Sequence, residues 1–172
     1  MVGSILLFVT VLGLIGYSGE DRTEIPVVPC STDPLNPTTC YAGMTQQDLE
    51  VPSQFSVLTI DIEMRWAQGE STWVGVIPAS DATQCPPDED GLTSCEASDL
   101  HFIAGGPESE QGVFSWRLDP GEYRLGTGST SSEANPIAGN IVEYEFSARL
   151  NGFVALFTFL LGSVMLAAGI QL

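Results

Sequence analysis

The clearest pattern in the chain is a strict alternation of apolar and polar residues in the run LTIDIEMRW, from Leu58 to Trp66. Residues two apart lie on the same face of a β-strand, so this alternation predicts a strand with one buried and one exposed face. Other runs of apolar and β-forming residues predict further strands at 73–77, 100–104, 113–118, 122–125 and 141–150. The sequence DPG at 119–121 predicts a tight turn, because proline presets one backbone dihedral angle and glycine permits the next.

Six or more antiparallel strands with one wet face predict a β-sandwich. The run FSWRLDPGEYRL, from Phe114 to Leu125, resembles the strand-LxPGxY-strand hairpin of jelly-roll domains of the GOLD family. In that family a disulfide-containing sandwich precedes a C-terminal membrane helix. The resemblance implies a jelly-roll-like fold. It does not imply a cargo-receptor role, because the coiled coil that follows the sandwich in that family has no counterpart here.

The apolar residues at the two ends of the chain are continuous rather than alternating. Residues 1–17 and 151–172 contain no Asp, Glu, Lys, Arg or His, and every charged side chain lies between Glu20 and Arg149. The 22-residue run at the second end predicts a transmembrane helix, because about 20 apolar residues span the hydrocarbon core. Small residues that would allow close helix contact occur there at Gly162, Ser163, Ala167 and Ala168.

The first apolar run has two interpretations, a secretory signal peptide or an uncleaved N-terminal transmembrane helix (signal anchor). No basic residue precedes it, and the sequence YSG at 17–19 is a poor cleavage site, which favours the uncleaved anchor. The sequence therefore predicts an all-β ectodomain, an acidic antiparallel β-sandwich at 53–150, flanked by two transmembrane α-helices. The proline-rich residues 18–52 are expected to form an extended, disulfide-tied lead-in with one or two short edge strands.

Charge narrows the choice of partners. The chain has 22 carboxylates, five arginines and no lysine, for a net charge of −17. Nucleic acid is excluded as a partner because its binding requires a basic surface, and anionic lipid headgroups would be repelled. Such a composition is typical of proteins from salty surroundings, where ions screen self-repulsion, or of a merely acidic surface domain.

The four cysteines form two pairs with identical spacing, each pair bracketing nine residues: Cys30 with Cys40, and Cys85 with Cys95. Zinc sites place cysteines two to four residues apart, so this spacing predicts two local disulfides instead. Each loop would contribute about 2–3 kcal/mol in the chain-entropy model. Persistent disulfides indicate an oxidising compartment, which puts the acidic domain on the extracytoplasmic side of a cell membrane.

Two groups of charged residues are candidate sites. Asp88, Glu89 and Asp90 lie inside the second cysteine loop, where carboxylate oxygens suit Ca²⁺, although a solvated acidic loop is the alternative. Four arginines point outward on predicted strands and form either cross-strand ion pairs or an interaction patch for an anionic partner. They are Arg65, Arg117, Arg124 and Arg149.

No motif for a nucleophile, a P-loop, a zinc protease or a dinucleotide fold is present, and no cofactor other than Ca²⁺ is indicated. The lone His101, in a short apolar run, is expected to be structural. The sequence thus favours a non-catalytic, membrane-anchored module that acts with other membrane or envelope proteins, as an accessory subunit of an envelope complex. An ion- or ligand-binding surface module is the alternative hypothesis. An envelope hydrolase with two paired carboxylates is a third hypothesis.

Overall fold

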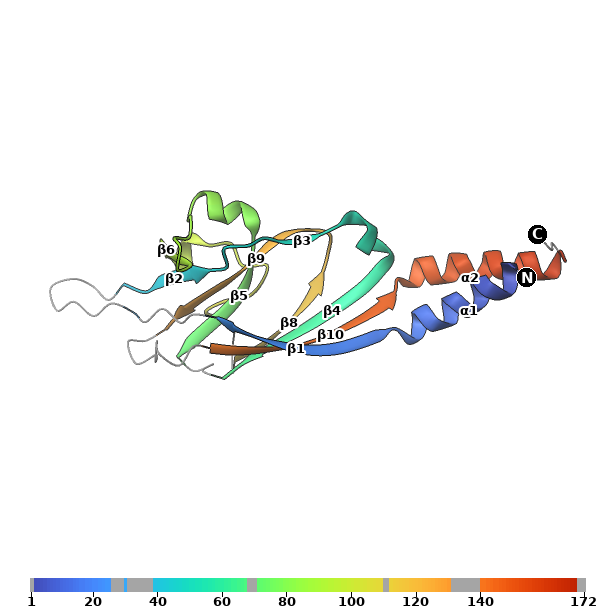
Figure 1. Cartoon of the computed structure of the whole chain (residues 1–172), viewed down its shortest axis with the longest axis horizontal. Coiled ribbons are helices and arrows are strands. Elements are labelled where there is room, and N and C mark those ends of the chain that lie inside the picture. The colour runs from blue at the N-terminus through green and yellow to red at the C-terminus, as the bar shows by residue number, and fades with distance from the viewer. Residues whose placement is uncertain are drawn as a thin grey trace.

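The computed structural model describes residues 2–25, 30, 39–67, 71–109, 112–130 and 140–169. The strands of this part form two antiparallel sheets that face each other, and both helices project from one end of them (Figure 1). The first sheet has the order β1-β10-β4-β8, with β1 Tyr17–Ile25, β10 Asn140–Leu150, β4 Leu58–Trp66 and β8 Val113–Leu118. The second has the order β6-β2-β9-β5-β7, with β3 paired to β9. Its strands are β2 Tyr41–Met44, β3 Leu49–Val51, β5 Thr72–Pro78, β6 Leu92–Glu96, β7 Ala104–Gly105 and β9 Gly121–Ser129.

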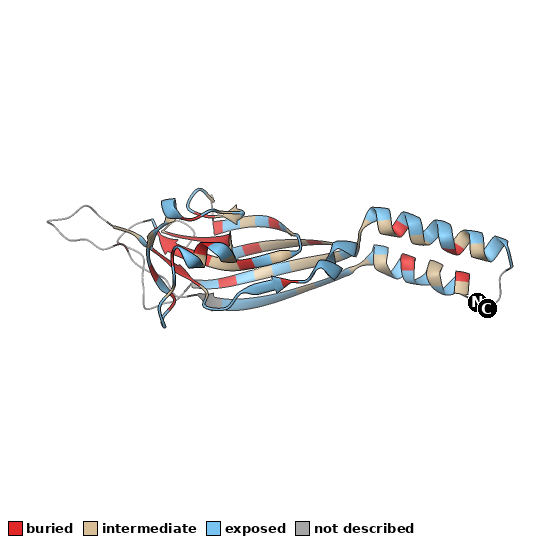
Figure 2. Cartoon of the chain, turned by 90° about the horizontal axis from the view of Figure 1, so that it is seen from above, coloured by how far each residue is buried: buried red, intermediate tan, exposed pale blue. Residues whose placement is uncertain are grey.

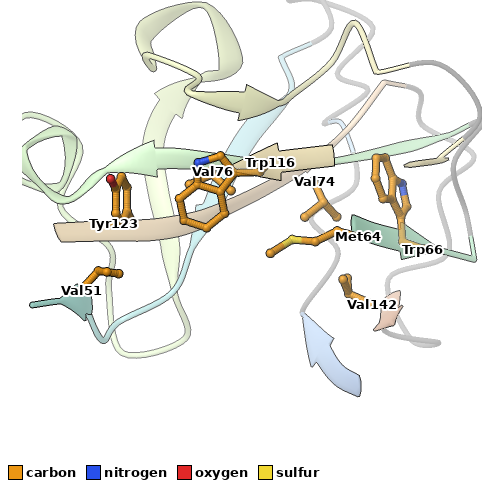
Figure 3. Close-up of a cluster of buried hydrophobic side chains, with 8 residues drawn as sticks. All are labelled: Val51, Met64, Trp66, Val74, Val76, Trp116, Tyr123 and Val142. Atoms are coloured by element: carbon orange, nitrogen blue, oxygen red, sulfur yellow. The ribbon is translucent and has the colours of Figure 1, made fainter. Parts of the chain in front are cut away.

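The predicted β-sandwich is confirmed, and its core lies between the sheets. Alternate residues of β4 point inward, and Met64 and Trp66 pack there against Val74 and Val76 of β5 (Figure 3). Trp116 of β8 meets Tyr123 of β9 edge to face, and the Tyr123 hydroxyl donates to the Asp119 carbonyl oxygen. The strands predicted at 58–66, 113–118 and 141–150 agree with β4, β8 and β10 to within a residue.

A second cluster of buried side chains covers the outer face of the five-strand path. Trp73 and Ile77 of β5 point away from the main core into this cluster, which explains why β5 is buried on both faces. The cover consists of two short 3-10 helices, η2 Ala79–Thr83 and η3 Ala97–Asp99, and of the segments that follow them. Phe102 closes over Trp73 at a centroid distance of 5.2 Å.

Two strand predictions need correction. The run 100–104 is not a strand: η3 ends at Asp99, and β7 begins only at Ala104. Leu100 and Phe102 are apolar because they cover the sheet from a loop, not because they alternate within it. The lead-in, expected to be mostly irregular, contains the nine-residue edge strand β1, which pairs along its whole length with β10.

The prediction of two flanking transmembrane helices is wrong. No helix among the described residues combines the length and apolar content needed to cross a membrane. The helix α1, Val2–Ile15, has 14 residues, and α2, Gly152–Ala167, has 16. At about 1.5 Å per residue these helices are about 21 and 24 Å long, against a hydrocarbon core of about 30 Å. Gly16, with φ of 75°, ends α1 and turns the chain directly into β1, and the Asn151 side chain caps α2 at its start.

Both predicted disulfides are present, Cys30–Cys40 and Cys85–Cys95. The second ties the loop after η2, in the cover layer, to the edge strand β6. The first lies at the boundary of the described residues, and most of its loop falls outside them.

Candidate functional site

The two helices form a pair whose closest approach is made by small and polar residues, with Leu7 packed against Gly162. The inward positions are Gly3 and Thr10 on α1, and Ala155, Thr158 and Gly162 on α2. A Cβ atom placed on Gly3 would lie 2.9 Å from the Gly162 carbonyl oxygen, so the backbones touch at this point. Further along, the buried Thr10 hydroxyl donates to the Thr158 hydroxyl at 2.9 Å. Gly162 was predicted from the sequence to allow close helix contact, and it does contact α1. Ala167 and Ala168, predicted on the same grounds, are exposed.

The large apolar side chains of the pair point outward. Phe8 is 64% exposed and Phe157 is 60% exposed, and exposed positions cover most of both helices in Figure 2. Taking about 100° per residue, these side chains occupy an arc of about 220° on each helix. The outward set is Ile5, Phe8, Val9, Val11, Leu12, Leu14 and Ile15 on α1, and Phe153, Leu156, Phe157, Phe159, Leu160, Leu161, Val164 and Leu166 on α2.

This distribution is the reverse of a helix pair in water, which turns an apolar stripe inward and a polar face outward. Helices packed in hydrocarbon make contact through small residues and hydrogen-bond their hydroxyls internally. Here the hydroxyls of Thr158 and Ser163 each donate to a carbonyl oxygen of the preceding turn of their own helix. The arrangement is therefore suited to apolar surroundings on all sides. Periodicity alone did not reveal it, because the inward positions depend on how the two helices meet.

The second candidate surface is the outer face of the four-stranded sheet. The strand register places Glu20, Glu145 and Glu63 side by side across β1, β10 and β4. These carboxylates and Asp61 line an open groove of about 520 Å³, together with serines of the same strands. Directly opposed like charges are unfavourable in a sheet, so this row makes the face strongly acidic at a cost in stability.

The four predicted arginines are all paired with carboxylates in the structure. Arg117 Nε lies 3.0 Å from Asp61 Oδ1, and Arg149 Nη2 lies 3.3 Å from the other oxygen of the same carboxylate. The hydrogen bond from Arg117 is the main reason that the pKa of Asp61 is lowered. Arg65 is hydrogen-bonded to Glu63 on the same strand, which raises the pKa of the guanidinium.

Arg124 lies apart from the other three arginines. It belongs to the second sheet, is largely buried and pairs with Asp48. Three of the four arginines therefore share one face, Arg117 and Arg149 in cross-strand ion pairs and Arg65 in a pair along its own strand. An anion-binding patch of all four is not assembled, and this face is dominated by carboxylates.

The acidic loop between Cys85 and Cys95 is a compact turn. Asp88 Oδ1 accepts hydrogen bonds from the backbone N–H groups of Asp90 at 2.9 Å and Leu92 at 2.8 Å. No group of three or more acidic, histidine or cysteine side chains within the described ranges is placed to hold a metal ion. The Asp88, Glu89 and Asp90 calcium site stays a prediction.

His101 has a structural place in the cover layer. Its backbone N–H donates to Asp81 Oδ2 at 2.7 Å, and its ring Nδ1 lies 3.4 Å from Asp81 Oδ1. Asp81 is buried, whereas the imidazole is 77% exposed. The carboxylate of Asp81 thus fastens the segment after η3 to η2, which follows β5.

No protein-family model and no curated protein matches the chain. Among solved structures, it is similar to a periplasmic inhibitor of g-type lysozyme, PliG, from Aeromonas hydrophila, with 10% identity and a TM-score of 0.29 over 74% of this chain and 98% of that one. It is also similar to lectin I-B4 from Griffonia simplicifolia, with 10% identity and a TM-score of 0.27 over 78% of this chain and 93% of the lectin. Likeness at this level carries no argument about function.

Proposed function

We propose that this protein is a non-catalytic, extracytoplasmic β-sandwich held at a cell membrane by its helix pair, where it acts through contacts with other membrane or envelope proteins. The observation that carries the proposal is the reversed packing of α1 and α2, with Gly3 and Gly162 in contact and Phe8 and Phe157 outward. Insertion into the hydrocarbon layer does not require either helix to cross it.

Lipid chains fit this surface better than a single protein partner. The outward residues extend around both helices, whereas a protein docked on one side would leave the rest in water. Neither helix carries an ionisable side chain, so none would have to be desolvated on insertion. At about 25 cal/mol per Å² of apolar surface, leaving two helices of this kind in water is a large cost.

The sandwich supplies the surface for interaction. The disulfides support an oxidising compartment and therefore an extracytoplasmic position. The exposed row of Glu20, Glu145 and Glu63 suits a cationic segment of a partner. The groove that they line is open rather than a deep cleft around two carboxylates, which supports an interaction role over hydrolysis.

Co-flotation of the full chain with vesicles of phosphatidylcholine tests the attachment. A triple variant on the outward helix surface, Phe8→Gln, Phe157→Gln and Leu160→Gln, should lose at least roughly a hundredfold in vesicle affinity, since each side chain contributes about 1–2 kcal/mol to transfer. A matched triple variant replaces exposed apolar residues of the sandwich: Leu92→Gln, Ile103→Gln and Ile141→Gln. This control should float as the wild type does. Equal flotation of both variants would overturn the proposal.

Crosslinking after gentle extraction tests the role in a complex. We expect adducts with one or more membrane or envelope proteins, and their loss when the acidic row is neutralised by Glu20→Gln, Glu63→Gln and Glu145→Gln. Flotation of that variant should not change, because its helices are intact. A chain that is strictly solitary after crosslinking in its own membrane contradicts the accessory-subunit role.

A further inference from the structure

The sandwich carries a ring of exposed apolar side chains where the helices leave it. Tyr17, the first residue of β1, is 69% exposed, and Phe55 and Val57, in the short 3-10 helix η1 (Ser53–Val57), are 43% and 44% exposed. The Val57 carbonyl oxygen accepts a hydrogen bond from the backbone N–H of Asn151 at 2.8 Å, which fixes η1 beside the start of α2. We refer to Tyr17, Phe55 and Val57 as the collar.

The collar continues the apolar surface of the helices. Ile15, at the end of α1, is 74% exposed, and Phe153, in the first turn of α2, is 78% exposed. Figure 1 shows η1, which precedes β4, at the same end of the sandwich as both helices. Tyr17 combines an apolar ring with a polar hydroxyl, and such side chains are enriched at the level of lipid headgroups. A bilayer that surrounds the helices would therefore meet the collar at its surface.

The charges around the collar are mainly negative. Glu50 and Glu122 lie directly opposite each other where β3 meets β9, and Asp119 lies in the turn after Leu118, all on the side of the sandwich near η1. All three carboxylates are exposed. The nearby cations are Arg117 and Arg149, whose guanidinium groups share the carboxylate of Asp61. Four carboxylates and two guanidinium groups leave this end of the sandwich with a net negative charge, which repels anionic headgroups.

We infer that the helix-bearing end of the sandwich is a membrane-interface surface that selects electrically neutral or zwitterionic lipid headgroups, with the collar at headgroup level. The inference rests on the proposed function, since it assumes that the helices enter lipid. It adds the depth of insertion and the lipid class. Repulsion from an anionic membrane should be strong at low salt, where the Debye length is about 10 Å or more, and weak at 1 M salt, where it is about 3 Å.

A tryptophan reporter tests the depth. The variant Phe55→Trp, in the full chain with phosphatidylcholine vesicles, should lose fluorescence when the lipid is brominated near the glycerol end of its acyl chains. Native Trp66, Trp73 and Trp116 are buried in the sandwich and should keep their emission. Leu92→Trp, on β6 at the other end of the sandwich, is the matched control and should also be unaffected.

Vesicles of phosphatidylglycerol test the lipid class. Affinity for them should rise at least roughly tenfold between 0.1 M and 1 M NaCl, because salt screens the repulsion, whereas affinity for phosphatidylcholine should be nearly constant. The inference is overturned if the chain floats with phosphatidylcholine but Phe55→Trp is not quenched, or if it binds the anionic vesicles equally at both salt concentrations. A chain that floats with neither lipid at either salt concentration refutes the proposed function itself.

Discussion

The substitution Gly128→Ala tests how the cover layer is packed on the sheet. Gly128 lies directly opposite Trp73 in the pairing of β9 with β5. A Cβ atom at this position would lie 2.5 Å from Trp73 Cζ2 and 2.7 Å from Cε2, well inside van der Waals contact. The indole is only 2% exposed and is held from its other side by Phe102, so it has no room to withdraw.

We expect Gly128→Ala to lower the free energy of unfolding by about 2 kcal/mol, within the range of about 1–3 kcal/mol for an overfilled core. For a chain of this size that loss corresponds to about 4–8 °C in Tm. The matched control is Gly126→Ala in the same strand, where a Cβ atom would lie 3.5 Å from Trp73 Cζ3, an ordinary contact. The control should stay within about 1 kcal/mol of the wild type, or gain slightly from reduced freedom of the unfolded chain.

Equilibrium unfolding in denaturant, followed by near-ultraviolet circular dichroism of the tryptophans, measures both variants. If the two variants are equally stable, or if Gly128→Ala loses no unfolding free energy, Trp73 is not packed directly against the backbone of β9 at Gly128.

Three further predictions concern charge, crosslinks and metal. The lowered pKa of Asp61, due first to its hydrogen bond from Arg117 and then to Arg149, implies stability that is present above the ordinary value of 3.8 and is lost as the pH falls below it. Asp61→Asn should remove this acid dependence at a cost below about 1 kcal/mol at neutral pH, and an unchanged acid transition contradicts the pairing. Replacing Cys85 and Cys95 together by alanine should cost about 2–3 kcal/mol in chemical denaturation, and a neutral result contradicts the loop-closure argument. Calorimetric titration with millimolar Ca²⁺ should give heat if the acidic loop between these cysteines binds the ion, and no heat rejects that prediction.

Strands with one well-covered face could be predicted from the sequence, and the edge strand could not. The alternation in Leu58–Trp66 reflects a core on one side of β4 and water on the other. In β1 the polar residues fall on both faces: Asp21 and Thr23 share a face with Tyr17, while Glu20 points the other way. Because β1 is the edge strand of its sheet, its inner face is incompletely covered. Asp21 on this face is exposed, and its carboxylate accepts a hydrogen bond from the Tyr144 hydroxyl.

The helix ends and the helix contact depended on tertiary structure. The apolar run at the first end continues past Ile15, but pairing of Tyr17 with β10 draws the chain into the sheet, and Gly16 alone absorbs the change of direction. The contact of Gly3 with Gly162 joins residues 159 positions apart, so no local pattern contains it. The GOLD-type resemblance stays a prediction.

Lipid photolabelling tests the central claim, that apolar chains surround the helix pair, most directly. The full chain is bound to phosphatidylcholine vesicles that contain a lipid with a photoreactive diazirine in its acyl chain, and the adducts are mapped by mass spectrometry. We expect adducts at outward residues such as Phe8, Phe157 and Leu160, and few or none at the inward Ala155 and Gly162 or on the acidic sandwich beyond the collar. Adducts spread over the sandwich, or none on either helix, would contradict it.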